Sequence, residues 1–386
     1  MAKTKSQRII ETDRKIEEAI AALALKQFSS IHQAAKHFNI GHNTLGHRLA
    51  GGKSVTESRE SVQLLTIPEE TALSQWITRL TVSGYPVSQA FLREMAEEIR
   101  QKHVHGVNEP SIQLVIYEPI GEQWVQRFLQ RHPHLKTAMG HSIELSRITD
   151  ASPEVIKRWY EIFFLTIEEY GIKWGNVYNQ DESGFAIGTK GRSHVVIDSN
   201  VKVGYQAEPG RREWATIVEC ICADGSSIPP LIIFKGKNLS KNWIPKQVPK
   251  GWHVSANLTG WTSNIHGQEW LEKCFEPATR EKANEQMQLL ICDGHDSHIS
   301  GKFIRHCIQH DIVLILLPPH CSHLLQPLDV SIFGPLKSAL SKELDHIFRT
   351  GISTLQKIEW FQAFMKAHVS SINVKNIQGG WRGTGI

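Results

Sequence analysis

Three aspartates occupy positions from which their carboxylates could hold divalent metal ions. They are Asp181 in VYNQDESGF, Asp293 in LLICDGHDSH and Asp329 in LLQPLDVSIFGPLK. Each follows or adjoins an apolar run, so each is expected at the edge of a rigid core. Carboxylate oxygens are hard ligands that suit Mg²⁺ or Mn²⁺, and such ions assist displacement at phosphorus. The pattern predicts the catalytic core of an enzyme that cuts and joins DNA.

Polar side chains near these aspartates are predicted to order the acidic site or to contact phosphate. They are His298, His323 and Gln326. The histidines of this region lack the ligand spacing of a zinc site, so zinc is not expected. Glu182 adjoins Asp181 but should point to the opposite face of a strand, and is interpreted as structural. Taken singly, an aspartate after a strand is more often a turn or cap residue.

The elements expected around the acids form a mixed sheet. The segments interpreted as strands are VYNQD, then GFAIG and HVVID with Gly and polar breaks between them, and then EWATIVECICADG, IPPLIIFKG, MQLLICDGH and IVLILLPPH. A hairpin turn at Asp224 and Gly225 is expected to join EWATIVECICADG to IPPLIIFKG. Strands in a meander followed by strands alternating with helices predict an α/β sheet with helices on both faces, and an RNase H-like order is one such arrangement. That order brings distant carboxylates to one sheet edge, as two-metal chemistry requires with ions ~3.5–4 Å apart.

The first fifty residues are predicted to form a small helix-turn-helix. They hold eight Lys or Arg against four Asp or Glu, which accounts for the whole net charge of +4. Ser30 and Gln33 form a capping box, and HNTLGHRLAGG is expected to open a third helix. The DNA-contacting side chains of that helix are predicted to be His42, Asn43, Thr44, His47 and Arg48. A three-helix bundle without a ligand is the alternative.

A second helical module is predicted after a polar linker. One helix is expected to start at residues 66–69, which combine a cap, an early proline and an acidic residue. The segment from Ser83 to Pro86 breaks it, and GEQWVQRFLQRHPHL forms a later helix. The face of that helix opposite its apolar pairs carries the predicted DNA-binding residues Gln126, Arg127, Gln130 and Arg131. Such a face alone is more often a solvated surface. Two modules in tandem favour recognition of a long DNA sequence, about two turns of duplex.

Composition adds a few constraints. The chain has 386 residues and 40% hydrophobic content, enough for two or three domains, and its six cysteines are expected to be free buried thiols. No apolar run approaches the ~20 residues needed to span a bilayer, so we expect a soluble intracellular protein. The lysines at 235, 237 and 241 are either contacts to DNA backbone or a solvated basic loop. Of Trp252, Trp261 and Trp270, at least two are expected in the core, and stacking on an unpaired base is the alternative.

The three aspartate-containing segments and the N-terminal helical modules together resemble the pogo/Fot-type transposases of the mariner superfamily. NQDESGFAIG, LLICDGHDSH and LPPHCSHLLQPLDVSIFGPLK are similar to the three acidic blocks of that family's DDE-type core, with 35 residues between Asp293 and Asp329. W-x-x-R-F-L-x-R-H-P at Trp124 to Pro133 resembles its centromere-protein-B-like DNA-binding region. The resemblance extends from about residue 10 to the end of the chain.

The resemblance implies a multidomain protein with two N-terminal all-α helix-turn-helix modules followed by an α/β RNase H-like DDE catalytic domain. The expected divisions are 1–55 (psq-like), 56–140 (centromere-protein-B-like), a helical connector at 141–175, the core at 176–350 and a C-terminal helical segment at 351–386, after which family members are expected to continue. Asp181, Asp293 and Asp329 would be the catalytic metal ligands, holding two Mg²⁺ or Mn²⁺ ions.

The implied function is cut-and-paste transposition. The partners would be double-stranded DNA of the element's terminal repeats and of the target, with TA as the expected target site. A homodimer or higher oligomer at synapsis and a nuclear location are implied as well. Asp296, where a small residue often stands, adds a carboxylate that would compete for metal. Two alternatives stay open: a transposase-derived DNA-binding protein with an inactive core, and a cellular RNase H-like nuclease, which leaves the helix-turn-helix modules unexplained.

Overall fold

The structure is a computed structural model. It describes residues 5–52, 63–83, 85–105, 119–138, 152–187, 213–294, 300–349 and 355–386. The chain divides into two compact units, Met1–Glu70 and Thr71–Ile386. No helix within these described ranges is long and apolar enough to cross a membrane. The strand predicted at HVVID, residues 194–198, lies outside the described residues.

The N-terminal unit contains the predicted three-helix arrangement. Its helices are α1 (Lys5–Ala24), α2 (Ile31–His37) and α3 (His42–Leu49). Ile16 and Ala19 of α1 pack against the two alanines of α2 and Leu45 of α3. The Ser30 side chain caps α2 by accepting a hydrogen bond from the backbone N–H of Gln33. The Ser30 half of the predicted capping box is therefore present, whereas the Gln33 side-chain oxygen accepts a hydrogen bond from the Ser29 hydroxyl at 2.7 Å.

The second helical module begins after the predicted polar linker. Its helices are α5 (Ile67–Val82), α6 (Gln89–His105) and α7 (Glu122–Arg131). Thr66 and Glu69 cap α5 reciprocally, each backbone N–H donating to the other's side chain. In α7 the rings of Trp124 and Phe128 stack with centroids 5.1 Å apart, and both are buried. The apolar face of α7 is the one that the i, i+4 spacing predicted.

A six-stranded mixed sheet forms the centre of the second unit. Its strands are β1 (Val177–Ile187), β2 (Glu213–Cys222), β3 (Ser227–Lys235), β4 (His253–Asn257), β5 (Gln288–Cys292) and β6 (Ile312–Leu316). The spatial order is β4-β3-β2-β1-β5-β6. β1, β2 and β3 are antiparallel neighbours, and β5 and β6 run parallel to β1. This is the RNase H-like order that the sequence predicts, and that prediction is confirmed.

One strand was not predicted. β4 pairs in parallel with β3 at the sheet edge, and every one of its residues is only half-buried. Its sequence, HVSAN, has neither the length nor the apolar run of the other strands. A short edge strand of this kind lacks a strong sequence signal, because only one of its sides is paired.

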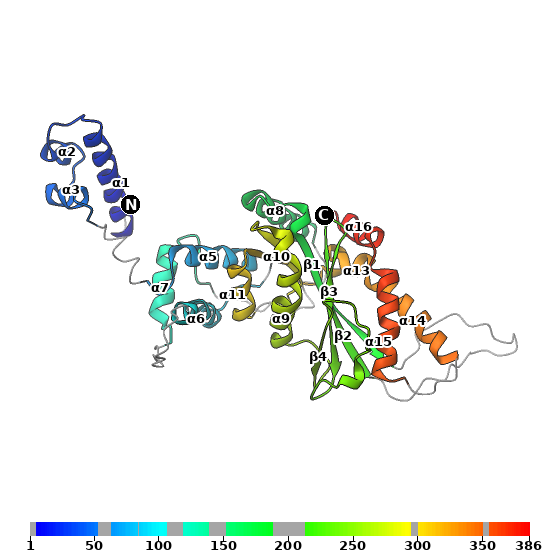
Figure 1. The fold of residues 1–386 in the computed structure, drawn as a ribbon. Helices are drawn as coiled ribbons and strands as arrows, with labels where there is room; N and C mark the ends of the chain where they lie inside the picture. The colour runs from blue at the N-terminus through cyan, green and yellow to red at the C-terminus, as the bar shows by residue number, and fades with distance from the viewer. Residues whose placement is uncertain are drawn as a thin grey trace. The chain divides into compact units, whose positions relative to one another are not determined.

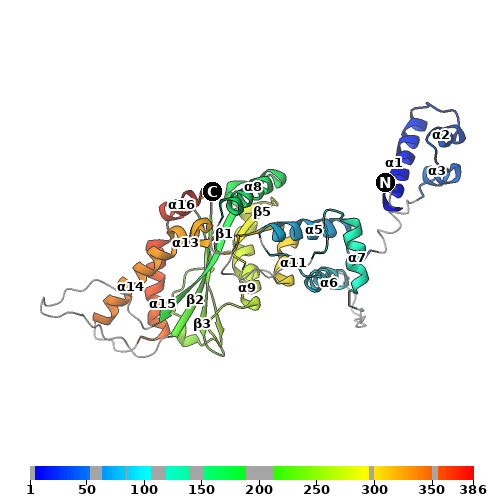
Figure 2. The ribbon, with the colours of Figure 1, turned by 180° about the vertical axis from the view of Figure 1, so that it is seen from behind.

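Helices cover both faces of the sheet, as Figures 1 and 2 show. One face shares its apolar core with α8 (Pro153–Tyr170), α13 (Pro327–Ser331), α14 (Phe333–Arg349), α15 (Lys357–Ser371) and α16 (Val374–Gly383). The other face packs on α9 (Asn264–Trp270), a π-helical turn at Leu271–Phe275 and α10 (Glu276–Ala283). Odd positions of β1 such as Phe185 point to the first face, and Tyr178 meets Phe275 on the second. The strand alternation therefore assigns each residue of β1 to a face.

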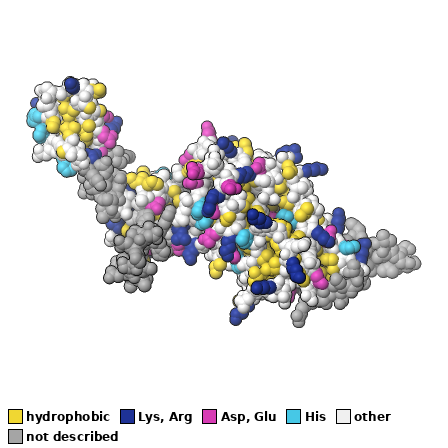
Figure 3. All heavy atoms as spheres, in the orientation of Figure 1, with side chains coloured by type: hydrophobic (Ala, Val, Ile, Leu, Met, Phe, Trp, Pro, Cys, Tyr) yellow, Lys and Arg dark blue, Asp and Glu magenta, His cyan; other side chains and the backbone are white. Residues whose placement is uncertain are grey.

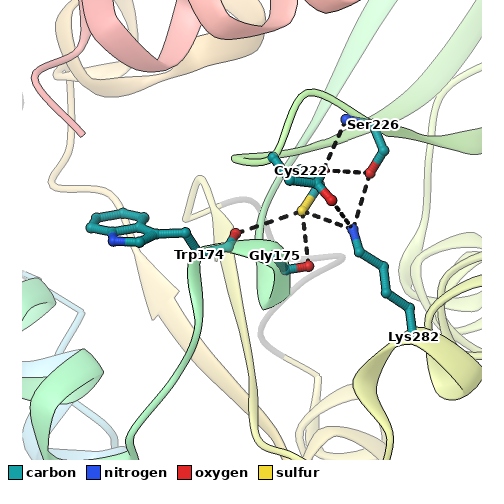
Figure 4. Close-up of polar contacts among 6 residues, drawn as sticks. Trp174, Gly175, Cys222, Ser226 and Lys282 are labelled. Carbon is teal, nitrogen blue, oxygen red and sulfur yellow. Dashed lines mark hydrogen bonds and ion pairs between the residues drawn. The ribbon is translucent and has the colours of Figure 1, made fainter.

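The turn between β2 and β3 is fastened to α10 by a polar cluster (Figure 4). Lys282 of α10 pairs with Asp224 at 2.6 Å and donates to the Ser226 hydroxyl and to the Cys222 sulfur. The Cys222 thiol donates to the carbonyl of Gly175 at 3.1 Å. Burial alone would raise the pKa of Asp224, but the hydrogen bonds from Lys282 and Ser226 outweigh it and lower that pKa to about 2. All six cysteines are free and buried, as expected.

The second helical module packs on the sheet-containing half through α6 and α11 (Gly301–Gln309). Arg305 of α11 pairs with Glu98 of α6 at 3.1 Å. The Ser83 hydroxyl, in the predicted helix break, donates to the carbonyl of Leu316 at 2.9 Å and is buried. The Trp159 indole of α8 donates to the same carbonyl at 3.0 Å. The helix break therefore joins the module to the end of β6.

Candidate functional site

Two parallel strands bring the first two aspartates to the same level of the sheet. In the register between β1 and β5, Asn179 lies opposite Ile291. Continuing that register by two residues sets Asp293, which follows β5, level with Asp181 in β1. Asp181 and Asn179 share the strand face that is covered by α13, because side chains alternate with a period of two. Asp329 lies in the first turn of α13.

A buried asparagine fixes the position of the third aspartate. The Asn179 side-chain oxygen accepts the backbone N–H of Leu328 at 3.1 Å. Its amide donates to the Gln326 side-chain oxygen at 3.3 Å and to the carbonyl of Ile291 at 3.2 Å. One side chain therefore connects β1, β5 and the start of α13, which carries Asp329. The sequence interpretation missed Asn179, although a polar residue on the same strand face as Asp181, two positions before it, was a signal.

The three carboxylates act on one another electrostatically. Burial first, and then the charges of Asp329 and Asp293, raise the pKa of Asp181 well above its usual value, while the Gln326 amide lowers it. Burial also raises the pKa of Asp329, an effect that Lys337 opposes and Asp293 reinforces. Asp181 is 7% exposed, Asp293 is half-buried and Asp329 is exposed. The site thus holds negative charge that the surrounding protein only partly compensates.

The chemistry of this donor set fits a hard divalent cation. Carboxylates near one another repel, and an ion between them removes the repulsion while satisfying their lone pairs. Asp181, Asp293 and Asp329 are the residues that would hold such an ion. Across the ranges that the structure describes, no group of three or more His, Cys, Asp and Glu side chains is already arranged to hold a metal. The three carboxylates are close enough to affect one another's pKa, but they do not form a closed set of metal ligands.

A tyrosine from the second helical module reaches the group of Asp181, Asp293 and Asp329, hereafter the acidic group. A Cβ added at Gly294 would lie 1.9 Å from the ring of Tyr85, so the ring rests directly on the residue after Asp293. Burial, followed by the charges of Asp293 and Cys321, raises the pKa of Tyr85 to about 12. The sequence interpretation treated this tyrosine only as part of a helix break. No local pattern indicates that the break touches a strand end more than two hundred residues later.

The other residues predicted for the acidic site have different outcomes. Gln326 is fully buried and lies beside Asp181, where its amide lowers the pKa of that carboxyl. His323 is exposed in α12 (Ser322–Leu325), and its charge lowers the pKa of Asp329. His298 and Asp296 lie outside the described residues.

The predicted DNA-contacting residues lie on the surfaces of two helices. Those of α7, namely Gln126, Arg127, Gln130 and Arg131, are all exposed. In α3 the residues His42, Asn43, Thr44 and His47 are exposed. Arg48 differs from the expectation, because its side chain is only 13% exposed and pairs with Asp13 of α1 at 3.5 Å. The polar residues of α3 and α7 lie opposite the buried stripe of each helix, so hydrophobic periodicity predicted their exposure. It could not predict the Asp13 pairing.

Two known protein families match parts of this chain. Residues 211–381 match the DDE superfamily endonuclease family, and residues 68–139 match the Tc5 transposase DNA-binding domain. The endonuclease match includes Asp293 and Asp329 and begins after Asp181.

Curated relatives match most of this chain. One, named MFS-type transporter clz9, from Cochliobolus lunatus, is 29% identical over 94% of this chain and 34% of that protein. The human pogo transposable element with ZNF domain is 21% identical over 81% of this chain and 20% of that protein. This chain therefore spans about a third or less of the length of these two relatives.

Solved structures also resemble the chain. The crystal structure of the Mos1 strand transfer complex has a TM-score of 0.39 at 11% identity, covering 100% of this chain and 95% of that one. The Mos1 mariner paired end complex with Mn has a TM-score of 0.36 at 11% identity, covering 99% and 97%. From these two matches, the chain contains a DDE superfamily endonuclease domain at residues 211–381, preceded at residues 68–139 by the DNA-binding domain of Tc5 transposases, and pogo transposable elements are among its relatives.

Proposed function

We propose that this protein is a DNA transposase that binds the terminal repeats of an element and cuts and rejoins DNA at the acidic group. One observation carries the proposal. Asp181, Asp293 and Asp329 come from three separate parts of the chain, and at one edge of an RNase H-like sheet the charges of Asp293 and Asp329 raise the pKa of Asp181. Acids that repel one another in this way are costly unless a cation is to be held. The exposed polar faces of α3 and α7 supply the DNA-binding side of the proposal.

The residues have distinct roles in the proposed reaction. Asp181 is held rigidly in β1, while Asn179 fixes the helix start that presents Asp329. Two Mg²⁺ or Mn²⁺ ions, when bound by these carboxylates, supply activation of the attacking water and stabilisation of the leaving 3′ oxygen. The freed 3′-hydroxyl then attacks target DNA in the same site, so no covalent bond between protein and DNA is needed. TA target sites, nuclear localisation and a dimer at synapsis are parts of the same proposal.

A DNA-binding protein with an inactive core is the second candidate. The observation that favours it is the open arrangement of the acids, with Asp329 exposed and no closed set of metal ligands among the described residues. In that case the DNA-binding modules would be the functional part of the chain. The two candidates differ in a single measurable property, which is metal-dependent cleavage.

The test is a nicking assay on terminal-repeat DNA with Mg²⁺ or Mn²⁺. Wild type is expected to cut, and Asp293→Ala is expected to lose cutting while its binding to the same DNA, measured by footprinting, is retained. Asp345→Asn, on α14, changes an acid outside the acidic group and is the matched control, expected to cut normally. Binding without cutting by the wild type would select the inactive-core candidate, and unaltered cutting by Asp293→Ala would remove the proposed mechanism.

A further inference from the structure

Two tryptophans are exposed beside the catalytic strand, although proteins usually bury most of this side chain. Trp214, near the start of β2, is 42% exposed, and Trp261, between β4 and α9, is 55% exposed. Their rings are stacked, with centroids 6.5 Å apart and planes inclined by 21°. Gly184 of β1 lies against both, because a Cβ there would be 3.5 Å from Trp214 and 3.7 Å from Trp261. Trp270, by contrast, is buried, and Trp252 is half-buried against the core.

Backbone and side-chain hydrogen bonds hold the loop that presents Trp261. The Asn257 amide donates to the Trp261 carbonyl at 2.5 Å, and the Trp261 N–H donates to the Thr259 hydroxyl at 3.3 Å. The Thr216 hydroxyl of β2 donates to the carbonyl of Gly260 at 2.7 Å. The indole is therefore presented by a preformed loop, and a ligand that stacks on it does not have to order that loop first.

The surroundings of the tryptophan pair are basic. Between Asp224 and Glu269 the chain contains five lysines and neither Asp nor Glu. Lys235 is exposed and lies under the loop, since a Cβ at Gly260 would be 3.1 Å from its Cβ. Figure 3 shows basic side chains beside hydrophobic ones over the end of the sheet at which β4 lies. An aromatic surface bordered by lysines suits a ligand with flat rings and negative charge.

The pair is close to the acidic group in the fold. Gly184 follows Asp181 by three residues in β1, which is roughly 10 Å along the strand. β5 ends at Cys292, one residue before the level of Asp181, so among the described residues the rest of β1 has no paired strand on the β5 side. Gly184 faces the side of the sheet opposite to Asp181, because strand positions alternate. A DNA strand that leaves the acidic group and passes around the end of β5 would reach the tryptophans.

We propose that Trp214 and Trp261 form a stacking platform for one unpaired nucleobase of the DNA strand that is processed at the acidic group. The proposal rests on the proposed function, because a base becomes unpaired here only if the duplex is opened beside the acids. Every base presents a flat face, so the site would accept any of them. Lys235 and its neighbours would hold the adjoining phosphates.

The test compares binding of two duplexes of one arbitrary sequence to the full chain without metal. One duplex is blunt, and the other carries a short unpaired 3′ overhang containing a fluorescent adenine analogue. Wild type is expected to bind the overhang duplex more tightly and to quench the analogue. Trp261→Ala is expected to lose about tenfold in affinity for the overhang duplex only, and Trp261→Phe to keep most of it. Trp174→Ala removes an equally exposed tryptophan, 47% exposed, that lies before β1, and is expected to behave as wild type.

Three results with the variants would overturn the inference. One is equal loss by Trp261→Ala and Trp174→Ala, and another is equal loss for both duplexes. The third is a dimer that Trp261→Ala dissociates, measured by light scattering, which would assign the face with its exposed neighbours Leu258 and Ile265 to a second copy of the chain. A wild type that binds both duplexes alike refutes the platform alone, whereas a wild type that binds neither duplex also contradicts the proposed function.

Discussion

Asp181 combines two destabilising circumstances, since it is buried and it faces other carboxylates. Its raised pKa is caused first by burial and then by Asp329 and Asp293. The sequence predicted that these three acids would lie together, because each adjoins an apolar run that fixes a strand or helix end, and their mutual effect on pKa agrees with that. It did not predict Asn179, whose role depends on hydrogen bonds to residues more than a hundred positions away. It also did not predict Tyr85, which contacts Gly294 through the tertiary fold alone.

Replacing Asp181 by Asn is expected to stabilise the metal-free protein at pH 7 while abolishing metal-dependent cleavage. A carboxyl whose folded-state pKa is raised carries an unfavourable charge above that pKa, and asparagine removes it. As the pH falls through the raised pKa towards the unfolded value of about 3.9, the wild-type carboxyl is protonated and the difference in stability disappears. Thermal unfolding at several pH values measures this. Asp345→Asn should show no such gain, and a destabilised Asp181→Asn would contradict the electrostatic interpretation.

At the scale of elements, α13 is positioned by the C-terminal helix. Gly380 of α16 lies against α13, where an added Cβ would be 2.6 Å from the carbonyl oxygen of Pro327. Ser331 of α13 also donates to the carbonyl of Asn376 in α16. The amphipathic patterns of the chain predicted most helices and five of the six strands, whereas this helix crossing has no sequence signal beyond adjacent glycines. The C-terminal segment, expected only to be helical, therefore helps to place Asp329.

A matched pair of glycine substitutions tests this packing. Gly380→Ala is expected to push α13 away, destabilise the protein by about 1–3 kcal/mol and reduce cleavage, because the added methyl overlaps backbone. Gly379→Ala is the control, since its nearest neighbour would be the Ser331 hydroxyl at an ordinary 3.7 Å. Removing a helical glycine there should instead stabilise by up to about 1 kcal/mol. Unfolding curves and the nicking assay report both effects, and equal behaviour of the two variants would show that the crossing does not hold α13.

The whole molecule joins two helical modules, of which the second matches a transposase DNA-binding domain, to a half that matches an endonuclease family. The helices of both modules were predictable from capping residues and apolar periodicity, and the fold class of the core from its strand order. The sequence gives no indication that α6 packs on α11 through Glu98 and Arg305, because such contacts depend on distant segments. Function at this scale requires that DNA bound by the modules also reaches the acids.

Arg127→Ala on α7 is expected to weaken binding of terminal-repeat duplex and to reduce the slope of log affinity against log salt by about 1, as loss of one phosphate contact would. Thermal stability should not change, because the side chain is exposed. Lys157→Ala removes an equal charge from the exposed face of α8 and should leave the slope unaltered. An unchanged slope for Arg127→Ala, measured by fluorescence anisotropy across salt concentrations, would remove α7 from the DNA interface.

Replacing each proposed metal-binding aspartate by cysteine tests the shared cation site most directly. Each of Asp181, Asp293 and Asp329 is replaced in turn by Cys, and cleavage of terminal-repeat DNA is measured with Mg²⁺ and with Mn²⁺. A thiolate is a poor ligand for Mg²⁺ and a better one for the softer Mn²⁺. All three variants should be inactive with Mg²⁺ and regain cutting with Mn²⁺, while wild type cuts with both. Full activity of any of the three variants with Mg²⁺ would show that its aspartate does not hold the ion.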